Sequence, residues 1–299
     1  MTRAFRCSAE SRLRADPIEG TASTVRAFLL VECPGPWGVE ALRDARLDSE
    51  VKARLQALEV ATGIRPLLIR RTATRDRRGV RVFAAHARGS HPWLETVRLS
   101  HSRELLDLDL APLGEGRSLG LQPHTEPVFL VCTHGRHDAC CAERGRPLQA
   151  ALAAAAPSQA WEVSHIGGDR FAPNVLVLPH GLYYGRLAPE DAPGFTELHR
   201  AGRLDLAHLR GRSTYPFPVQ AAEIHLRRRL GAVGIEPLAL VRHTRLGSET
   251  RAVFVVDGQR WEVRLRTGQG ERLQLTCSAP RQARPLEHHL VGIEPVAGP

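Results

Sequence analysis

Thiols, imidazoles and a carboxylate gather in two short stretches near the middle of the chain. The first stretch, CTHGRHDACC, carries Cys132, Cys140 and Cys141. The second stretch, SHIGGDRFAPN, carries His165 and Asp169. Thiolates and imidazoles together are the ligands that suit zinc and iron-sulfur clusters. The two stretches therefore predict a metal or redox centre.

The elements that flank these stretches predict that the side chains meet. Cys132 directly follows the apolar run PVFLV, Cys141 lies in the first turn of the next predicted helix, and His165 ends the strand after that. In open α/β folds, strand ends and helix starts converge on one crevice. The N-terminus of the helix also favours the thiolate form of Cys140 or Cys141.

The wider pattern predicts an α/β protein in which one order of elements occurs twice. Apolar runs and helical spacing predict, in this order, a strand, a helix and three strands at 27–32, 38–61, 66–69, 80–85 and 93–99. The same order recurs, with a strand, a helix and three strands at 127–131, 139–156, 161–165, 174–178 and 182–186. The two parts are therefore interpreted as similar units, the first one degenerate.

The last part of the chain predicts a small α+β appendage. Residues 187–218 are polar and contain proline and glycine, which indicates a helix and a connection rather than core. A helix and four strands are predicted after them, at 219–230, 238–242, 252–256, 261–265 and 273–276, with a tight hairpin turn at the Asp-Gly pair 257–258. The tail from Ser278 offers no clear element. We expect three domains, at 1–124, 125–215 and 216–299.

These stretches resemble the sucrase/ferredoxin-like family, which belongs with the thioredoxin-like ferredoxins. The resemblance rests on CTHGRHDACCAERGRPL (132–148), on WEVSHIGGDRFAPNVLVLPHGLYYGRL (161–187), and more weakly on GTAS and FLLVECPGPWG near the start. It covers most of the first 215 residues. It implies a thioredoxin-like fold with one [2Fe-2S] cluster, which the family holds with two cysteines, eight residues intervening, and with two histidines in an H-x-x-x-H pattern.

Carried over to this chain, the family pattern implies Cys132, Cys141 and His165 as ligands. The second histidine position holds Asp169, and carboxylate is a hard ligand that is rare for iron-sulfur clusters. The fourth ligand therefore stays open among four residues, namely Asp169, Cys140, His134 and His137. The cofactor-binding set also includes Gly167 and Gly168, whose bare backbone could approach a sulfide and donate N–H hydrogen bonds.

Each of these residues also has a purely structural interpretation. Cys132 and Cys141 could be small buried hydrophobic side chains, and His165 could bond a backbone carbonyl. Asp169 could form a turn or a salt bridge with Arg170 or Arg136, and the glycine pair could only shape a turn. The remaining cysteines are isolated in the sequence and are expected to be structural: Cys7, Cys33 and Cys277.

The function that we expect is electron transfer by a carrier that is not an enzyme. Its partner would be a reductase or an oxidase. Two alternatives stay open: a thiol-redox protein that uses Cys132 with Cys140 or Cys141, and a zinc-stabilised interaction module without electron transfer. The family's label also implies sucrose cleavage, which requires two carboxylates facing a sugar. The nearest acidic cluster has the pattern of a solvated face: Glu104, Asp107 and Asp109.

Composition limits the class of protein and its surroundings. A chain of 299 residues, 42% hydrophobic and 24% charged, is typical of a globular protein and excludes a disordered or fibrous one. No apolar run reaches the roughly 20 residues that span a bilayer, and the start lacks the apolar block of a secretory signal, so we expect a cytoplasmic protein. The net charge of +9 could steer an acidic partner, but no nucleic-acid module accompanies it.

Overall fold

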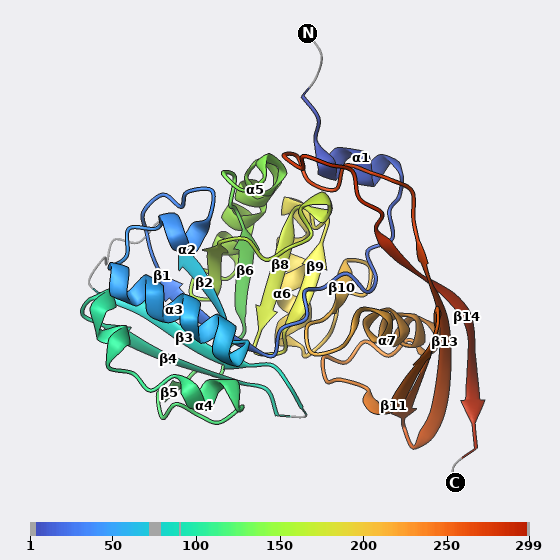
Figure 1. Cartoon of the computed structure of the whole chain (residues 1–299). Helices are drawn as coiled ribbons and strands as arrows, with labels where there is room; N and C mark the ends of the chain where they lie inside the picture. Colours follow the sequence, from blue (N-terminus) through green and yellow to red (C-terminus); the bar gives the residue numbers. More distant parts are fainter. Residues whose placement is uncertain (1–3, 72–78, 90, 298–299) are drawn as a thin grey trace.

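The fold is built on one large mixed sheet. The computed structural model describes residues 4–71, 79–89 and 91–297. Ten strands form the sheet in the order β10-β9-β8-β6-β7-β2-β1-β3-β4-β5 (Figure 1). Along the chain these are β1 (Ala27–Glu32), β2 (Arg65–Arg70), β3 (Val80–His86), β4 (Trp93–Leu99), β5 (Gln122–Pro123), β6 (Val128–Cys132), β7 (Ala160–Val163), β8 (Asn174–Leu178), β9 (Leu182–Gly185) and β10 (Leu209–Arg212).

Seven α-helices are found in the described ranges, together with a second sheet. The helices are α1 (Cys7–Leu13), α2 (Ala41–Asp44), α3 (Ser49–Thr62), α4 (Ala111–Gly114), α5 (Ala139–Ala155), α6 (Ala192–Arg200) and α7 (Phe217–Leu230). Short 3₁₀ turns are η1 (Ser102–Leu106), η2 (Asp169–Phe171) and η3 (Pro189–Asp191). The antiparallel second sheet contains β11 (Ala239–Leu246), β12 (Glu249–Val256), β13 (Gln259–Gln269) and β14 (Leu286–Val296). The predicted α/β class with a C-terminal appendage is confirmed.

The large sheet consists of two halves with the same topology. In the first half β1 pairs parallel with β2 and antiparallel with β3, which pairs antiparallel with β4. In the second half β6 pairs in the same way with β7 and β8, and β8 with β9. This is the strand order of a thioredoxin-like unit, present twice. The halves join where β2 pairs antiparallel with β7.

Local sequence explains where the helices that cover the sheet begin and end. The region predicted as one helix over 38–61 contains two helices, because the Asp48 side chain accepts a hydrogen bond from the Glu50 N–H and starts α3 anew. Gly63, at φ 70°, ends α3 in the left-handed conformation. Asp138 caps α5 in the same way by accepting from the Cys140 N–H. Pro147 lies inside α5.

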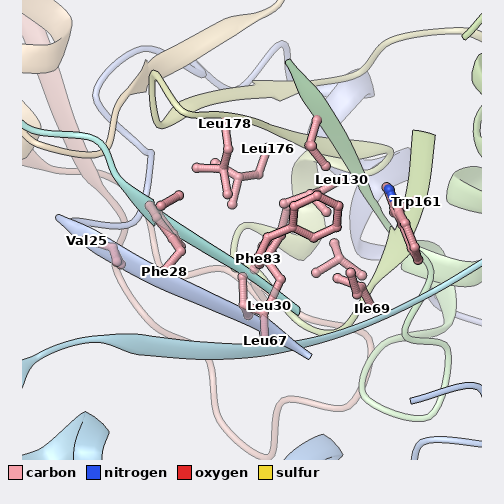
Figure 2. Packing of buried hydrophobic residues seen from close by; sticks show 14 of the residues in the cluster. Val25, Phe28, Leu30, Leu67, Ile69, Phe83, Leu130, Trp161, Leu176 and Leu178 are labelled. Carbon is pink, nitrogen blue, oxygen red and sulfur yellow. The ribbon is translucent and has the colours of Figure 1, made fainter. Parts of the chain in front are cut away.

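One core joins the two halves of the sheet. Alternate residues of the strands point to the same face, so that Phe28 and Leu30 of β1 pack in one cluster with Leu130 of β6 and Trp161 of β7 (Figure 2). On the opposite face, α3 packs against the first half and α5 and α6 pack against the second half. The apolar end of this shared core, at Cys132, is where the candidate site begins.

Three predictions about the C-terminal third are wrong. Residues 187–218 contain the predicted helix, α6, but they belong to the core, because α6 buries Phe195 and β10 pairs with β9 along the edge of the sheet. The strand predicted at 273–276 is only an isolated bridge between Leu273 and Ala283. The tail contains a strand, β14, which pairs antiparallel with β13. The polar sequence of β14 did not predict a strand, because the strand depends on backbone hydrogen bonds from β13. The hairpin at 257–258 is confirmed, since both residues have positive φ.

The second sheet of the appendage packs against helix α7. Buried residues of α7, among them Val219 and Leu226, contact Phe254 of β12 and Val263 of β13. No helix among the described residues is both long enough and apolar enough to cross a membrane.

Candidate metal centre

Two buried thiols begin the site at the end of β6 and the start of α5. Cys132 is the last residue of β6 and points into the shared core, and Cys141 lies in the first turn of α5. The two thiols interact with each other, and each side chain is only 1% exposed. The helix can approach the strand end closely because of Gly145, where a Cβ atom would lie 2.2 Å from the Cys132 carbonyl oxygen.

The loop after β7 adds an imidazole and a carboxylate. His165 lies two residues beyond β7 rather than ending it, because the strand stops at Val163. Its Nδ1 is 3.2 Å from Oδ1 of Asp169. The Cys141 thiol donates to the same oxygen at 3.2 Å. Cys132, Cys141, His165 and Asp169 thus meet, as the sequence predicted, while their role as ligands stays a prediction.

Two further histidines lie on the cysteine loop, at different distances from this group. The His137 ring centroid is 3.8 Å from that of His165, and its Nε2 is 3.9 Å from Oδ2 of Asp169. His134 is turned away, with Nε2 2.7 Å from the Gly38 carbonyl oxygen. Of the two, only His137 can offer a ligand atom in one group with His165 and Asp169.

Cys140 is the third alternative for the fourth ligand, and its side chain takes a different direction from that of Cys141. Its Sγ lies 3.4 Å from Sγ of Cys277. It belongs to a small apolar cluster with Cys7 and Ala172.

The glycine pair gives the loop its shape and admits a buried arginine. Gly167 and Gly168 have φ of 88° and 82°, which L side chains rarely adopt. A Cβ atom at Gly168 would lie 2.2 Å from Nη2 of Arg210. Arg210, from β10, donates to the Gly167 carbonyl at 3.0 Å and to Oδ1 of Asn174 at 2.8 Å. Donation from the glycine N–H groups to a sulfide stays a prediction.

Arg210 was missed by the sequence reasoning. It lies in the segment that was interpreted as connection, and a single arginine among 41 basic residues carries no distinguishing pattern. The short alternation LRGR in β10 is the only signal that could have marked a strand there.

The thiols, the imidazole and the carboxylate of the site shift one another's pKa values. The interaction with Cys141, followed by that with His165, lowers the pKa of Cys132 to about 5 against the opposing effect of burial. The same contact and burial raise the pKa of Cys141. Burial alone would lower the pKa of His165, but Asp169 and Cys132 raise it to about 9. The group therefore pairs anions with an imidazolium ion, and binding of a metal would release protons from it to the solvent.

Only the histidine side of the site reaches the surface. The side chains of His165 and His137 are 27% and 31% exposed, whereas that of Asp169 is 3% exposed. The thiol side is covered by the core and by α5. Mixed thiolate and imidazole donors with an exposed imidazole edge define a candidate metal or redox centre on a thioredoxin-like unit.

Comparison with known proteins shows the family of the chain. Residues 18–211, more than half of the chain, match the model of the sucrase/ferredoxin-like family, so the chain belongs to that family. It is 29% identical over 86 residues to altered inheritance of mitochondria protein 32 of Meyerozyma guilliermondii. That match covers 25% of this chain and 30% of the yeast protein, so the chain matches less than a third of this relative's length.

Solved structures of a small ferredoxin are also similar. A thioredoxin-like [2Fe-2S] ferredoxin from Aquifex aeolicus is 18% identical, with a TM-score of 0.28, over 31% of this chain and 97% of the ferredoxin. A cysteine-to-serine variant of it is 20% identical, with a TM-score of 0.25, over 28% of this chain and 97% of that chain.

Proposed function

We propose that this protein is an electron carrier that holds one [2Fe-2S] cluster with Cys132, Cys141, His165 and Asp169. The observation that carries the proposal is the meeting of two buried thiols, an imidazole and a carboxylate from three separate segments. When bound, such a cluster takes up and releases one electron at a time.

The donor set fits a cluster of this kind. Some iron-sulfur centres are bound by both thiolates and imidazoles, and this site offers two thiolates and one imidazole. The Nδ1 atom of His165 is buried, and among the described residues it makes no hydrogen bond of good geometry, although Asp169 is close. Because this nitrogen and the Asp169 carboxylate lie on the same side of the site, loss of the imidazolium proton would leave both as donor atoms for a metal.

The chain's own residues would set the properties of the centre. The buried thiols keep water from one side, and the exposed edge of His165 offers the shortest route for an electron from the surface. A carboxylate brings one more negative charge than a second imidazole does, so Asp169 would hold the reduction potential below that of a two-histidine centre.

Visible absorption and chemical analysis test the proposal. The full chain, purified without oxygen, should be brown and contain about two irons and two sulfides. Cys132→Ser should remove the colour, whereas Cys33→Ser, a change at another buried cysteine, should keep it. A colourless protein whose Cys132 and Cys141 form a reversible disulfide would instead support thiol-redox chemistry.

The role of Asp169 needs its own variants. Asp169→Ala should change the spectrum and lower the iron content, and Asp169→His should raise the reduction potential by at least about 100 mV by restoring a second imidazole. His137→Ala should leave the spectrum unchanged. If His137→Ala removes the cluster and Asp169→Ala does not, His137 is the fourth ligand and the carrier function still stands.

The partner in this proposal is an acidic reductase or oxidase. A surface depression beside His134 is lined by Arg136 and Arg146, by Glu143, and by Arg70, which is paired with Glu162 at 2.8 Å. Together with the net charge of +9, Arg136 and Arg146 would attract a negatively charged surface. The rate of electron transfer to an acidic redox protein should fall as salt is raised from about 0.05 to 0.5 M, and a rate that does not depend on salt would contradict this docking mode.

A further inference from the structure

A second group of thiols lies on the other side of the start of α5. Cys7 is the first residue of α1, Cys140 is the second residue of α5, and Cys277 lies in the connection between β13 and β14. Sγ of Cys277 is 3.4 Å from Sγ of Cys140 and 3.6 Å from Sγ of Cys7. In Figure 1 the red connection reaches α1 and α5 at the top of the molecule.

A buried carboxylate completes this group. Asp138, only 1% exposed, accepts hydrogen bonds from the Cys140 N–H at 2.9 Å and from the Cys277 N–H at 2.6 Å. Its two oxygens lie 3.7 and 3.6 Å from Sγ of Cys7. One ligand atom from each of the four residues lies within 4.8 Å of all the others. The backbone bonds fix the carboxylate in place and leave lone pairs on both oxygens.

We propose that Cys7, Cys140, Cys277 and Asp138 bind one Zn²⁺ ion. A tetrahedral zinc site with Zn–S bonds near 2.3 Å and Zn–O bonds near 2.0 Å places neighbouring sulfurs about 3.8 Å apart and sulfur and oxygen about 3.5 Å apart. The sulfur separations of 3.4 and 3.6 Å, and the sulfur-to-oxygen separations of 3.6 and 3.7 Å, are close to these values.

Other occupants explain the group less well. A [2Fe-2S] cluster places at most two thiolates on one iron and a [4Fe-4S] cluster places one on each, so either cluster would need at least one of these three sulfurs farther from the other two. A disulfide would join two of the cysteines at about 2 Å and leave the third thiol and the buried carboxylate without a role. A single four-coordinate ion uses all four side chains.

The site would act as a structural clamp. It would tie the N-terminal helix α1 and the C-terminal connection to the start of α5, and the two outer cysteines are 270 positions apart in the chain. Four protein ligands leave no open position, which is typical of structural zinc. Because Cys140 precedes Cys141, the ion would also fix the first turn of α5, from which Cys141 faces the first site.

Metal analysis of the purified full chain tests the inference. About one zinc per chain is expected, measured by plasma mass spectrometry, and Cys277→Ser should lower the zinc content at least tenfold. The double variant Cys132→Ser/Cys141→Ser removes the first site and should keep the zinc. Cys33→Ser is the matched control, because Cys33 is a buried free cysteine outside both groups.

Cobalt provides a measurement that does not depend on the folding of Cys277→Ser. Co²⁺ added to the metal-free double variant should give the visible bands of a tetrahedral thiolate site, and zinc should abolish them. Loss of zinc from the double variant but not from Cys277→Ser would overturn the inference, and so would a chain that takes up neither ion. A disulfide between Cys140 and Cys277 in the protein as isolated would also overturn it.

Discussion

Arg210 binds the loop that carries His165. Its replacement by methionine should lower the free energy of unfolding and increase the mobility of this loop. The guanidinium group is fully buried. It donates four hydrogen bonds, to the carbonyl and the hydroxyl of Thr21, to the Gly167 carbonyl and to Asn174. Methionine has a similar reach and no donor, so these acceptors would stay buried without a partner.

The expected loss follows from two opposing terms. Four hydrogen bonds from a charged donor contribute about 6 kcal/mol, taken at the lower limit of about 1.5 kcal/mol each. Against this, burial lowers the pKa of Arg210 from 12.5 to about 10, which corresponds to about 3 kcal/mol that methionine does not cost. The free energy of unfolding should therefore fall by about 3 kcal/mol.

Equilibrium unfolding in urea measures this difference. The fluorescence of the four tryptophans reports the transition, with wild type and variants compared in the same metal-free reducing buffer. Arg43→Met is the matched control, because the Arg43 side chain is 65% exposed and its surface ion pair contributes little to stability. The reasoning is refuted if Arg210→Met unfolds within 1 kcal/mol of that control.

Three further changes test other parts of the fold, each by urea unfolding. Gly168→Ala should cost more than Gly120→Ala by about 2 kcal/mol, because both glycines have positive φ but only Gly168 faces Arg210; equal losses would contradict this. Burial lowers the pKa of His199 to about 3, so the neutral side chain contributes its full stability above pH 6.5. The free energy of unfolding of the wild type should fall by about 2 kcal/mol between pH 6.5 and 5. His199→Leu should remove this loss. Unchanged acid sensitivity would argue against it. Glu223→Gln should cost about 3 kcal/mol, since two buried arginines would lose their counter-charge, and a loss below 1 kcal/mol would show that they find other partners.

Strong apolar runs made most of the sheet predictable. The strands β1, β4 and β8 begin and end where the sequence predicted. In β1 and β8 this follows from a continuous apolar run, and in β4 from several apolar and β-branched residues despite Glu95 and Arg98. The meeting of Cys132 with Cys141 was predictable for the same reason, since a strand end and the next helix start are neighbours in an α/β unit. The order of elements along the chain was therefore sufficient to predict that the two thiols of the first site meet.

Elements that depend on distant partners were not predictable. The helix α1, the strand β10 and the strand β14 have short or polar sequences that become regular only against their neighbours. The second thiol group depends on α1 and on the connection that leads to β14, because Cys7 and Cys277 come from opposite ends of the chain. No spacing rule joins cysteines that are separated by a whole fold.

The first half of the sheet contributes contacts to the candidate site. Leu30 of β1 and Leu130 of β6 lie on the shared core face and pair with β3 and β8 in the same way, so the position equivalent to Cys132 in the first half holds Glu32, whose carboxylate accepts from the Arg81 N–H at 2.9 Å. The loops of this half still hold the centre: the Gly38 carbonyl contacts His134, and Ser23 donates to the Ile166 carbonyl at 3.0 Å. In addition, β2 pairs with β7, the strand that leads to His165. The first half therefore supports one side of the site, while the second half supplies its donor side chains.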